Sequence, residues 1–173
     1  MPRRTVDLNV LAPYQKLLPR MWLRRVALRA MDVAAPGEAL ALSVTMTNDD
    51  TVRALNRQYR GLDDTTDVLA FSATHPGHWE GDGTPPADST SPAAFVMPPG
   101  EQEPLGEVVV SVPQAQRQAQ AAGHGLDQEV ALLITHGVLH LAGYDHVEIE
   151  ETAAMQAKER EALAQLAPAA APR

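Results

Sequence analysis

Alternation of apolar and polar positions along the chain predicts four short β-strands. In the first two, an apolar residue occupies every second position, which is the period of a strand with one buried face. Val6, Leu8 and Val10 show this alternation near the N-terminus. The four predicted strands cover residues 5–10, 40–46, 66–71 and 105–111.

Helical spacing of the apolar residues predicts five helices between and after these strands. They cover residues 20–34, about 49–59, 113–122, 126–142 and 147–166. Gly61 and Gly123 follow two of them, as glycine often does at a helix C-terminus. The order of elements therefore predicts an α+β fold, in which a small mixed four-stranded sheet is covered by about five helices.

Residues 72–104 break this periodic pattern. The segment holds seven prolines and four glycines and few branched apolar residues. Such a composition cannot bury much apolar surface, so we expect a long mobile insertion. A chain of 173 residues otherwise fits one domain, which we place at residues 1–166. The Ala- and Pro-rich residues 167–173 are expected to form a frayed tail.

Composition excludes several classes of protein. The chain has no cysteine, which excludes a disulfide framework and a thiolate zinc site and suits a reducing compartment. It has no apolar run of about 18 residues, so we expect no membrane span. The basic residues near the N-terminus are not followed by the apolar segment of a signal peptide.

The charge is unevenly distributed. Residues 1–60 carry ten basic and five acidic residues, a net charge of +5, whereas residues 61–173 carry four basic and seventeen acidic residues, a net charge of −13. A basic N-terminal third can present a local face for an anionic substrate on an acidic protein. Solvated helix faces are the simpler explanation for most of these arginines.

Three of the six histidines lie within eleven residues, in a predicted helix and the turn after it. His136 and His140 are four residues apart, so on a helix they lie on one face, one turn apart. Gly143 is a natural end for the helix and lets the chain return His146 toward the other two imidazoles. Three imidazoles leave a fourth position open, which is typical of a catalytic zinc site. The alternative is a hydrogen-bonded core cluster of histidines.

The residue after the first histidine departs from a protease pattern. His-x-x-x-His-x-x-Gly-x-x-His has the spacing of the metzincin zinc signature, in which glutamate follows the first histidine and acts as general base. Here that position is Gly137, and no carboxylate on the same helix replaces the glutamate. The predicted site is therefore built like that of a hydrolase but lacks the protease base.

Three stretches of the chain resemble the YbeY family of bacterial endoribonucleases that mature ribosomal RNA. Residues 136–146, with His-Gly in place of His-Glu, resemble the signature of the family. Residues 55–71 resemble its Leu-Asn-x-x-Tyr-Arg and Pro-Thr-Asp-Val-Leu-Ser-Phe block, and residues 105–111 resemble its Leu-Gly-Asp-Ile-x-Ile-Ser strand. The resemblance covers about residues 40–160, in the same order as in the family.

The chain departs from the family pattern at three positions in these stretches. Thr65 stands where the family usually has proline, Ala70 where it has serine and Glu107 where it has aspartate. None of the three is a predicted metal ligand. The segment 72–104 is also longer than usual, which bears on how substrate reaches the site.

The resemblance implies a zincin-like fold and one zinc ion per chain, bound by His136, His140 and His146. It implies a cytoplasmic hydrolase of single-stranded RNA that acts in late 3′-end maturation of 16S ribosomal RNA and in ribosome quality control. The expected partners are therefore ribosomal RNA and the small ribosomal subunit, with neither DNA nor a membrane among them. The functional arginine of the family corresponds to Arg60.

Elementary chemistry is consistent with these roles. Zinc lowers the pKa of a bound water to about 7, so a site can tolerate Gly137 in place of a base. The guanidinium of Arg60 matches a phosphate group, although a cation at a helix end is the alternative interpretation. Asp145 could orient a ligating imidazole or cap the turn.

Two other functions remain open from the residues alone. The same three histidines could serve a zinc peptidase or amidase, against which Gly137 argues. Alternatively, the chain could be a non-catalytic ribosome-assembly factor whose zinc only stabilises the fold.

Overall fold

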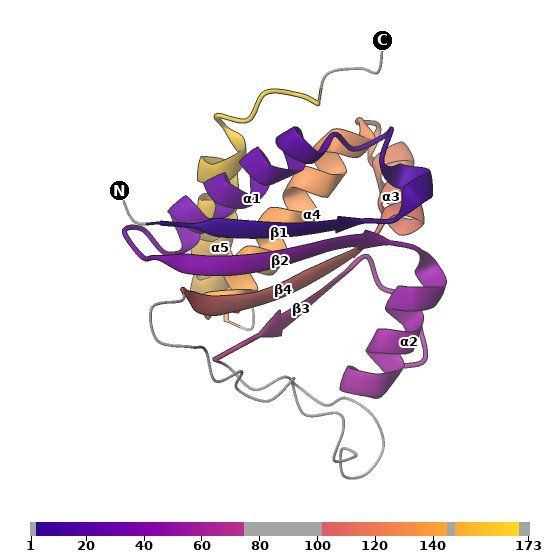
Figure 1. Ribbon diagram of the computed structural model, residues 1–173, viewed down its shortest axis with the longest axis horizontal. Coiled ribbons are helices and arrows are strands. Elements are labelled where there is room, and N and C mark those ends of the chain that lie inside the picture. The colour runs from indigo at the N-terminus through magenta and orange to yellow at the C-terminus, as the bar shows by residue number, and fades with distance from the viewer. Residues whose placement is uncertain (1–2, 75–101, 145–147, 170–173) are drawn as a thin grey trace.

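A four-stranded mixed sheet organises the protein (Figure 1). The computed structural model describes residues 3–74, 102–144 and 148–169. The strand order is β1-β2-β4-β3; β1 pairs parallel with β2 and β2 with β4, whereas β3 is antiparallel to β4. The strands are β1 (Thr5–Val10), β2 (Leu40–Thr47), β3 (Val68–Ser72) and β4 (Glu103–Ser111).

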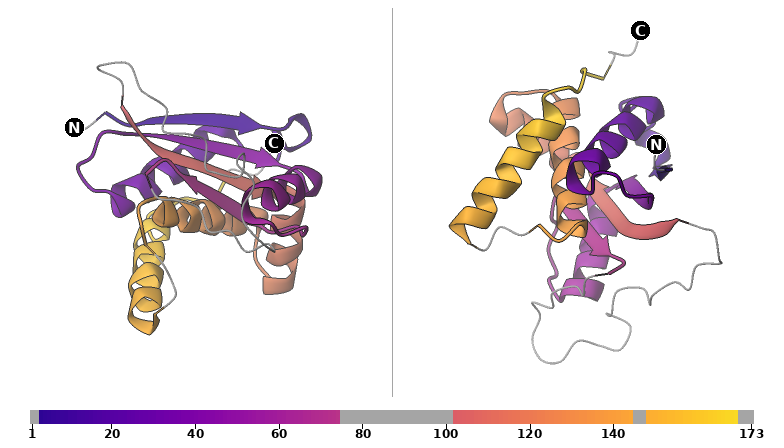
Figure 2. Two further views of the ribbon diagram at one scale, coloured as in Figure 1. Left: turned by 90° about the horizontal axis from the view of Figure 1, so that it is seen from below. Right: turned by 90° about the vertical axis from the view of Figure 1, so that its left-hand side faces the viewer.

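The described part of the chain has five α-helices around the sheet, and a short 3-10 helix (Ala12–Tyr14) follows β1. They are α1 (Arg20–Ala34), α2 (Asp49–Arg60), α3 (Val112–Ala122), α4 (Leu126–Leu141) and α5 (Ile149–Leu163). Helices α1 and α4 lie against one face of the sheet, and α5 packs outside them with its N-terminal end projecting away from the body (Figure 2). The predicted α+β fold is confirmed.

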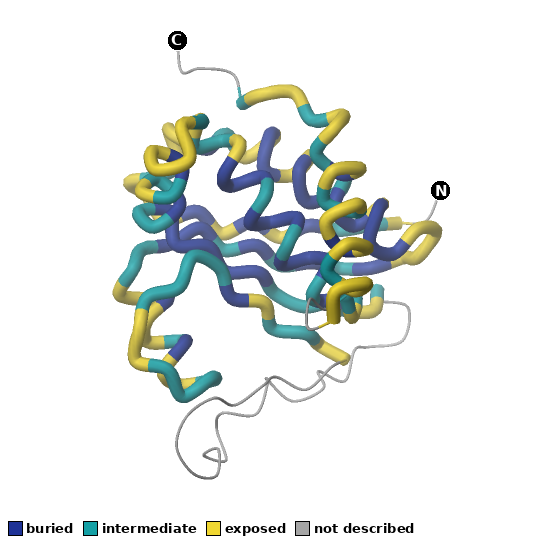
Figure 3. The backbone as a smooth tube through the Cα atoms, turned by 180° about the vertical axis from the view of Figure 1, so that it is seen from behind, coloured by how far each residue is buried: buried dark blue, intermediate teal, exposed yellow. Residues whose placement is uncertain are grey.

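The main core lies between the sheet and helices α1 and α4 (Figure 3). Alternate strand residues such as Val44 and Val108 point into it and are fully buried. Helix α4 contributes the largest helical share, since ten of its sixteen residues are buried. Because most sides of α4 are buried, only a narrow stripe of the helix lies at the surface.

Helix α2 packs on the opposite face of strands β3 and β4. Val52 forms a second apolar cluster with Leu69 and Val109, against which Phe71 also packs. Val109 follows Val108 in β4, and successive strand residues point to opposite faces. Helices α2 and α4 therefore cover opposite faces of β3, which is an edge strand.

Capping and ionic contacts hold α2 in place. The side chain of Asn48 accepts a hydrogen bond from the backbone N–H of Thr51 at 2.9 Å, as an N-cap residue does. Asp49 accepts a hydrogen bond from Ser111 Oγ at 2.6 Å and lies 2.9 Å from Arg117 of α3. The helix ends at Gly61, with φ at 76°, as the sequence predicts.

Element boundaries differ from the predicted ones by a few residues. Strand β3 starts at Val68, because the Asp67 carboxylate accepts hydrogen bonds from the Thr66 hydroxyl and from the Val68 backbone in a local turn. Strand β4 starts at Glu103, inside the predicted insertion, and Pro104 pairs with Ala41 beside a register shift, a position where proline is tolerated. Helix α5 covers residues 149–163 rather than 147–166.

Two further sequence predictions concern the insertion and the tail. Residues 75–101 of the predicted mobile insertion lie outside the described residues, so that prediction stays open. In the first three residues of the predicted tail, the Ala167 carbonyl accepts a hydrogen bond from Trp22 Nε1 at 2.9 Å, and the Ala169 N–H donates one to Asp127 at 3.1 Å. Residues 170–173 lie outside the described residues. No helix within the described ranges is long and apolar enough to cross a membrane.

Gly106 is required where β3, β4 and the end of α4 meet. Its φ is +143°, and a Cβ atom there would lie 2.3 Å from the Phe71 carbonyl oxygen and 2.8 Å from Leu141 Cδ2. Both a strained backbone and a backbone collision oppose any side chain at this position. Glycine therefore lets the last turn of α4 approach the sheet.

We expect Gly106→Ala to lower the free energy of unfolding by about 2–4 kcal/mol, through backbone strain and overpacking. Urea denaturation measures this change. Gly123→Ala is the matched control, because Gly123 also has positive φ (73°) but no atom within 4 Å of the added Cβ. The control should lose only about 1–2 kcal/mol, the cost of the left-handed conformation. Equal losses in the two variants would contradict the proposed collision.

Candidate metal centre on helix α4

His136 and His140 lie together on the exposed stripe of α4. Both side chains are half-buried, and the residues between them, positions 137–139, are buried in the core. Their Nε2 atoms are 3.0 Å apart, and the two rings meet edge to face with centroids 4.6 Å apart. The helix therefore directs one nitrogen of each imidazole to the same point, as the spacing of four residues predicts.

This donor pair fits a zinc ion. Two imidazole nitrogens bound to one tetrahedral zinc, each at about 2.0–2.1 Å, lie about 3.3 Å apart. The observed separation of 3.0 Å between the two Nε2 atoms is close to that value. Small rotations of the two rings would open the remaining few tenths of an ångström.

The third predicted ligand lies outside the described residues. Residues 145–147 include both His146 and the predicted orienting residue Asp145. Within the described ranges, no group of three His, Cys, Asp or Glu side chains surrounds a possible metal position. The roles of His136, His140 and His146 as a set of three ligands therefore stay a prediction.

Glu159 of α5 contacts the other nitrogen of His136. Its Oε1 lies 2.6 Å from His136 Nδ1, and its side chain is only 15% exposed. Sequence reasoning did not identify this residue, because it lies in a charged helix without a recognisable motif. The one available signal is its spacing: Glu159 follows the buried Met155 by four residues, so both lie on the inward face of α5.

Gly137 is in contact with the sheet. A Cβ atom at this position would lie 2.8 Å from Val108 Cγ1 and 3.0 Å from Val108 Cγ2. Position 137 therefore points toward β4, and a carboxylate there would have to displace the core. The absence of a protease-type base after His136 thus has a packing reason as well as a chemical one.

Arg60 is the last residue of α2. Helix α2 packs on the face of edge strand β3 opposite the face that α4 covers. Tyr59, the neighbour of Arg60, packs edge to face on Phe71, with ring centroids 5.1 Å apart. The next strand residue is Ser72, whose Oγ lies 3.4 Å from the Leu141 carbonyl oxygen at the end of α4. The C-terminal ends of α2 and α4 thus flank the same end of β3. Arg60 and the two histidines approach this end from opposite faces.

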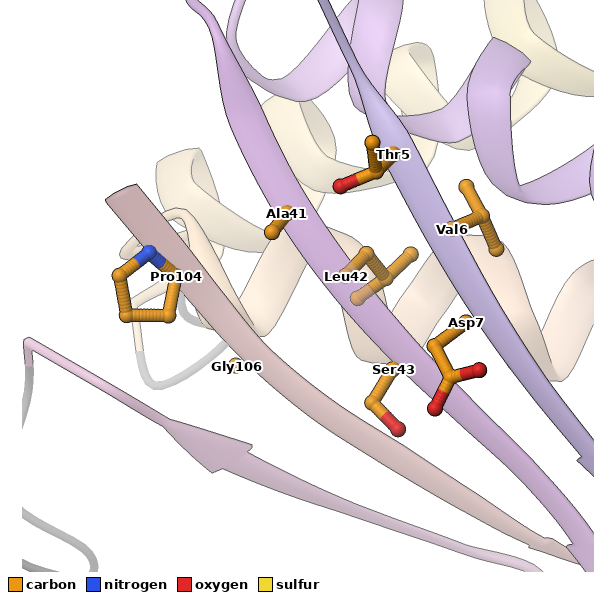
Figure 4. A pocket seen from close by; sticks show the side chains of 8 residues that line it. All are labelled: Thr5, Val6, Asp7, Ala41, Leu42, Ser43, Pro104 and Gly106. Atoms are coloured by element: carbon orange, nitrogen blue, oxygen red, sulfur yellow. The ribbon is translucent and has the colours of Figure 1, made fainter. Parts of the chain in front are cut away.

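A shallow pocket lies elsewhere, mainly over β1 and β2 on the face of the sheet opposite α1 and α4 (Figure 4). It has a volume of about 300 Å³ and includes Thr5, Asp7 and Ser43 in its lining. Glu107 belongs to the same face, where it accepts a hydrogen bond from Thr45 at 3.1 Å. Because the histidines lie on α4, on the other side of the sheet, neither this pocket nor Glu107 belongs to their site.

The N-terminal end of α4 carries a buried acid. Glu129 is 7% exposed and lies 3.1 Å from His124 Nε2. Burial raises the pKa of the Glu129 carboxyl, while the charge of His124 opposes and that of Asp67 adds to this shift. His124 therefore contacts the N-terminal end of α4, whereas His136 and His140 lie toward its C-terminal end.

Comparison with known proteins identifies the family. The family model described as Endoribonuclease YbeY matches residues 14–167. A relative of that name from Dehalococcoides mccartyi (strain CBDB1) is 37% identical over 155 residues, covering 88% of this chain and 89% of the relative. Another from Symbiobacterium thermophilum is 40% identical over 146 residues, covering 83% of this chain and 84% of the relative. The chain belongs to the YbeY family.

A solved structure shares the fold. The solution structure of TM1509 from Thermotoga maritima superposes with a TM-score of 0.53 at 19% identity, covering 95% of this chain and 91% of that chain. The three stretches that resemble the YbeY family in sequence also adjoin one another in space. They form the end of α2 with β3, strand β4, and the end of α4. The resemblance is thus concentrated around the edge strand beside the two histidines.

We expect Gly137→Ala to lower the stability of the native chain but to raise that of a Val108→Ala variant. In the native chain the new methyl group overpacks against Val108, at a cost of about 1–3 kcal/mol that exceeds the gain of about 1 kcal/mol in helix propensity. In the Val108→Ala variant the overpacking is absent, so only the gain in helix propensity remains. A double-mutant cycle by urea denaturation measures the coupling.

Val109→Ala supplies the control background for this cycle. Val109 is buried on the opposite face of β4, so Gly137→Ala should remain destabilising there. Gly137→Ala changing stability by the same amount in all three backgrounds would rule out the contact with Val108 as the cause.

Glu129 predicts a pH dependence of stability. A carboxyl with a raised pKa in the folded state favours folding below its unfolded pKa of about 4.3, and this advantage is lost as pH rises through the folded pKa. Glu129→Gln lacks this loss, so its unfolding free energy relative to the native chain should be higher at pH 8 than at pH 4. Urea denaturation at both pH values checks the sign, and a pH-independent difference would contradict it.

Proposed function

We propose that this chain is a metal-dependent endoribonuclease that cleaves single-stranded RNA. The observation that supports this most strongly is its membership of the YbeY family, together with the two imidazole nitrogens that converge 3.0 Å apart on α4. The relatives that carry the name Endoribonuclease YbeY align with most of the chain, including the part that contains both histidines.

His136 and His140 would hold a zinc ion, with His146 as the third ligand. When bound, zinc supplies Lewis acidity and a water of lowered pKa, which suits a site without a carboxylate at position 137. The residues of the chain contribute positioning and charge. The half-buried helix face fixes the two imidazoles, and His146, which follows the helix in the sequence, would supply the third ligand.

Arg60 would bind a phosphate oxygen of the RNA. Its guanidinium matches the geometry of phosphate, and positioning with charge neutralisation is the main requirement of phosphoryl transfer. Its place at the C-terminal end of α2 supports this role, because that end lies beside the same end of β3 as the histidines. RNA crossing the edge of β3 would meet Arg60 on one side and the histidines on the other.

The finer biological role follows from the family resemblance. We propose that the substrate is the 3′ end of 16S ribosomal RNA, that the small ribosomal subunit is the partner, and that the chain acts in the cytoplasm in rRNA maturation and ribosome quality control. The basic N-terminal third is consistent with an anionic substrate.

Packing argues against the peptidase alternative. A glutamate after His136 would collide with Val108, so the fold offers no space for the usual protease base at that position. An assembly factor with a purely structural zinc is less consistent with the position of the histidines. Their stripe lies at the surface of α4, whereas the core beneath is already filled by apolar side chains.

We expect His136→Ala and Arg60→Glu each to reduce cleavage of a single-stranded RNA by at least about 100-fold, through loss of a metal ligand or of a charge that stabilises the transition state. The assay follows labelled RNA on a gel, with metal content measured by mass spectrometry. His136→Ala should lose bound zinc, whereas Arg60→Glu should retain it.

Arg57→Glu is the matched control for Arg60→Glu. Arg57 lies in the same last turn of α2 but is exposed, so its reversal should leave cleavage nearly unchanged. Full cleavage by both His136→Ala and Arg60→Glu would overturn the proposed nuclease. Zinc-dependent cleavage of a peptide library without cleavage of RNA would favour the peptidase.

A further inference from the structure

Glu159 is the acidic residue that joins α5 to the histidine pair. Its carboxylate lies 2.6 Å from His136 Nδ1 across a separation of 23 residues. The Glu159 side chain is 15% exposed and that of His136 is 34% exposed, so both groups are largely shielded from water. A charged contact in such surroundings is stronger than an exposed one and is costly to leave unpaired.

We propose that Glu159 is a positioning residue, which holds His136 in the orientation and tautomer required of a metal ligand. This inference rests on the proposed metal site. An ionised carboxylate can only accept a hydrogen bond, so the imidazole proton must lie on Nδ1. The lone pair of Nε2 is then left facing His140 Nε2, 3.0 Å away. Partners of this kind orient metal-binding histidines and increase their basicity.

The geometry distinguishes this role from that of a ligand or a general base. The two nitrogens of an imidazole ring point in different directions, and Glu159 occupies the Nδ1 side while the histidine pair meets at Nε2. While Glu159 is bonded to Nδ1, it faces away from the position that a metal and its substrate would occupy. Glu159 therefore acts on the site through His136.

Helix α5 is anchored at the half that carries Glu159. Met155 and Ala162 on either side of Glu159 are buried. The Glu161 carbonyl accepts a hydrogen bond from Arg29 at 3.3 Å, and the Ala167 carbonyl just beyond the helix accepts one from Trp22. In contrast, the first residue of α5, Ile149, is 89% exposed, at the end that projects from the body (Figure 2). The packed half of α5 thus brings a carboxylate to His136.

Zinc affinity tests the proposal directly. Metal-free protein is titrated with zinc in competition with a chromophoric chelator, for the native chain and for Glu159→Gln and Glu159→Ala. We expect one zinc per native chain and an affinity about 10–100-fold weaker in both variants. Glutamine preserves the shape of the side chain and removes its charge, so native affinity in Glu159→Gln would overturn the proposal.

Glu161→Gln is the matched control. Glu161 lies two residues further along α5, in an exposed contact with Lys158 at 3.3 Å. It changes the same charge on the same helix without touching a histidine, so zinc affinity should equal that of the native chain. An equal loss in Glu161→Gln and Glu159→Gln would assign the effect to the overall charge of α5 and overturn the positioning role.

The tautomer of His136 gives a readout that needs no metal. In metal-free protein, nitrogen-15 NMR of the imidazole should show His136 protonated on Nδ1 in the native chain and a mixture of tautomers in Glu159→Ala. The same tautomer distribution in both would contradict the proposal. If the native chain binds no zinc, the proposed metal centre fails, while the NMR comparison still decides the role of Glu159.

Discussion

The close contact between α4 and β4 is the constraint on which the rest of the site depends. At Gly137 the helix lies so near Val108 that no side chain fits between them. This contact sets the rotation of α4 about its own axis, because the residue without a side chain must face the sheet. With that rotation set, His136 and His140 can only lie along the stripe that remains at the surface. The two histidines are thus oriented by core packing, and the same packing leaves no space for a glutamate after the first of them.

Edge strand β3 is the element around which the proposed active site is assembled. Helix α4 approaches it from the side of the main core, and α2 approaches it from the other face through a small separate cluster. Gly106 allows β3, β4 and the end of α4 to come together. An arginine on one side of an edge and a pair of converging histidines on the other are well placed to contact one polyanionic strand that crosses this edge.

Outer helix α5 differs from α1 and α4 in how little of it is buried. Only Met155 and Ala162 of its fifteen residues are buried, so it contributes little to the core. Its Glu159 carboxylate reaches His136 of the site. A helix that buries so little and yet carries a shielded charge beside a predicted ligand is better explained by what it does to the histidine than by its packing.

Local patterns along the chain were enough to predict the order of the elements, the α+β class and the pairing of His136 with His140. These depend on local periodicity: an apolar residue at every second position for strands, and a separation of four residues for one face of a helix. The sequence also predicted that the helix stops at Gly61, which places Arg60 at the C-terminal end of α2. The folded structure was needed to show which face of β3 each helix covers, why position 137 has no side chain, and that Glu159 reaches His136. The contacts of Gly137 with Val108 and of Glu159 with His136 join residues 23 or more positions apart, and no local period records them.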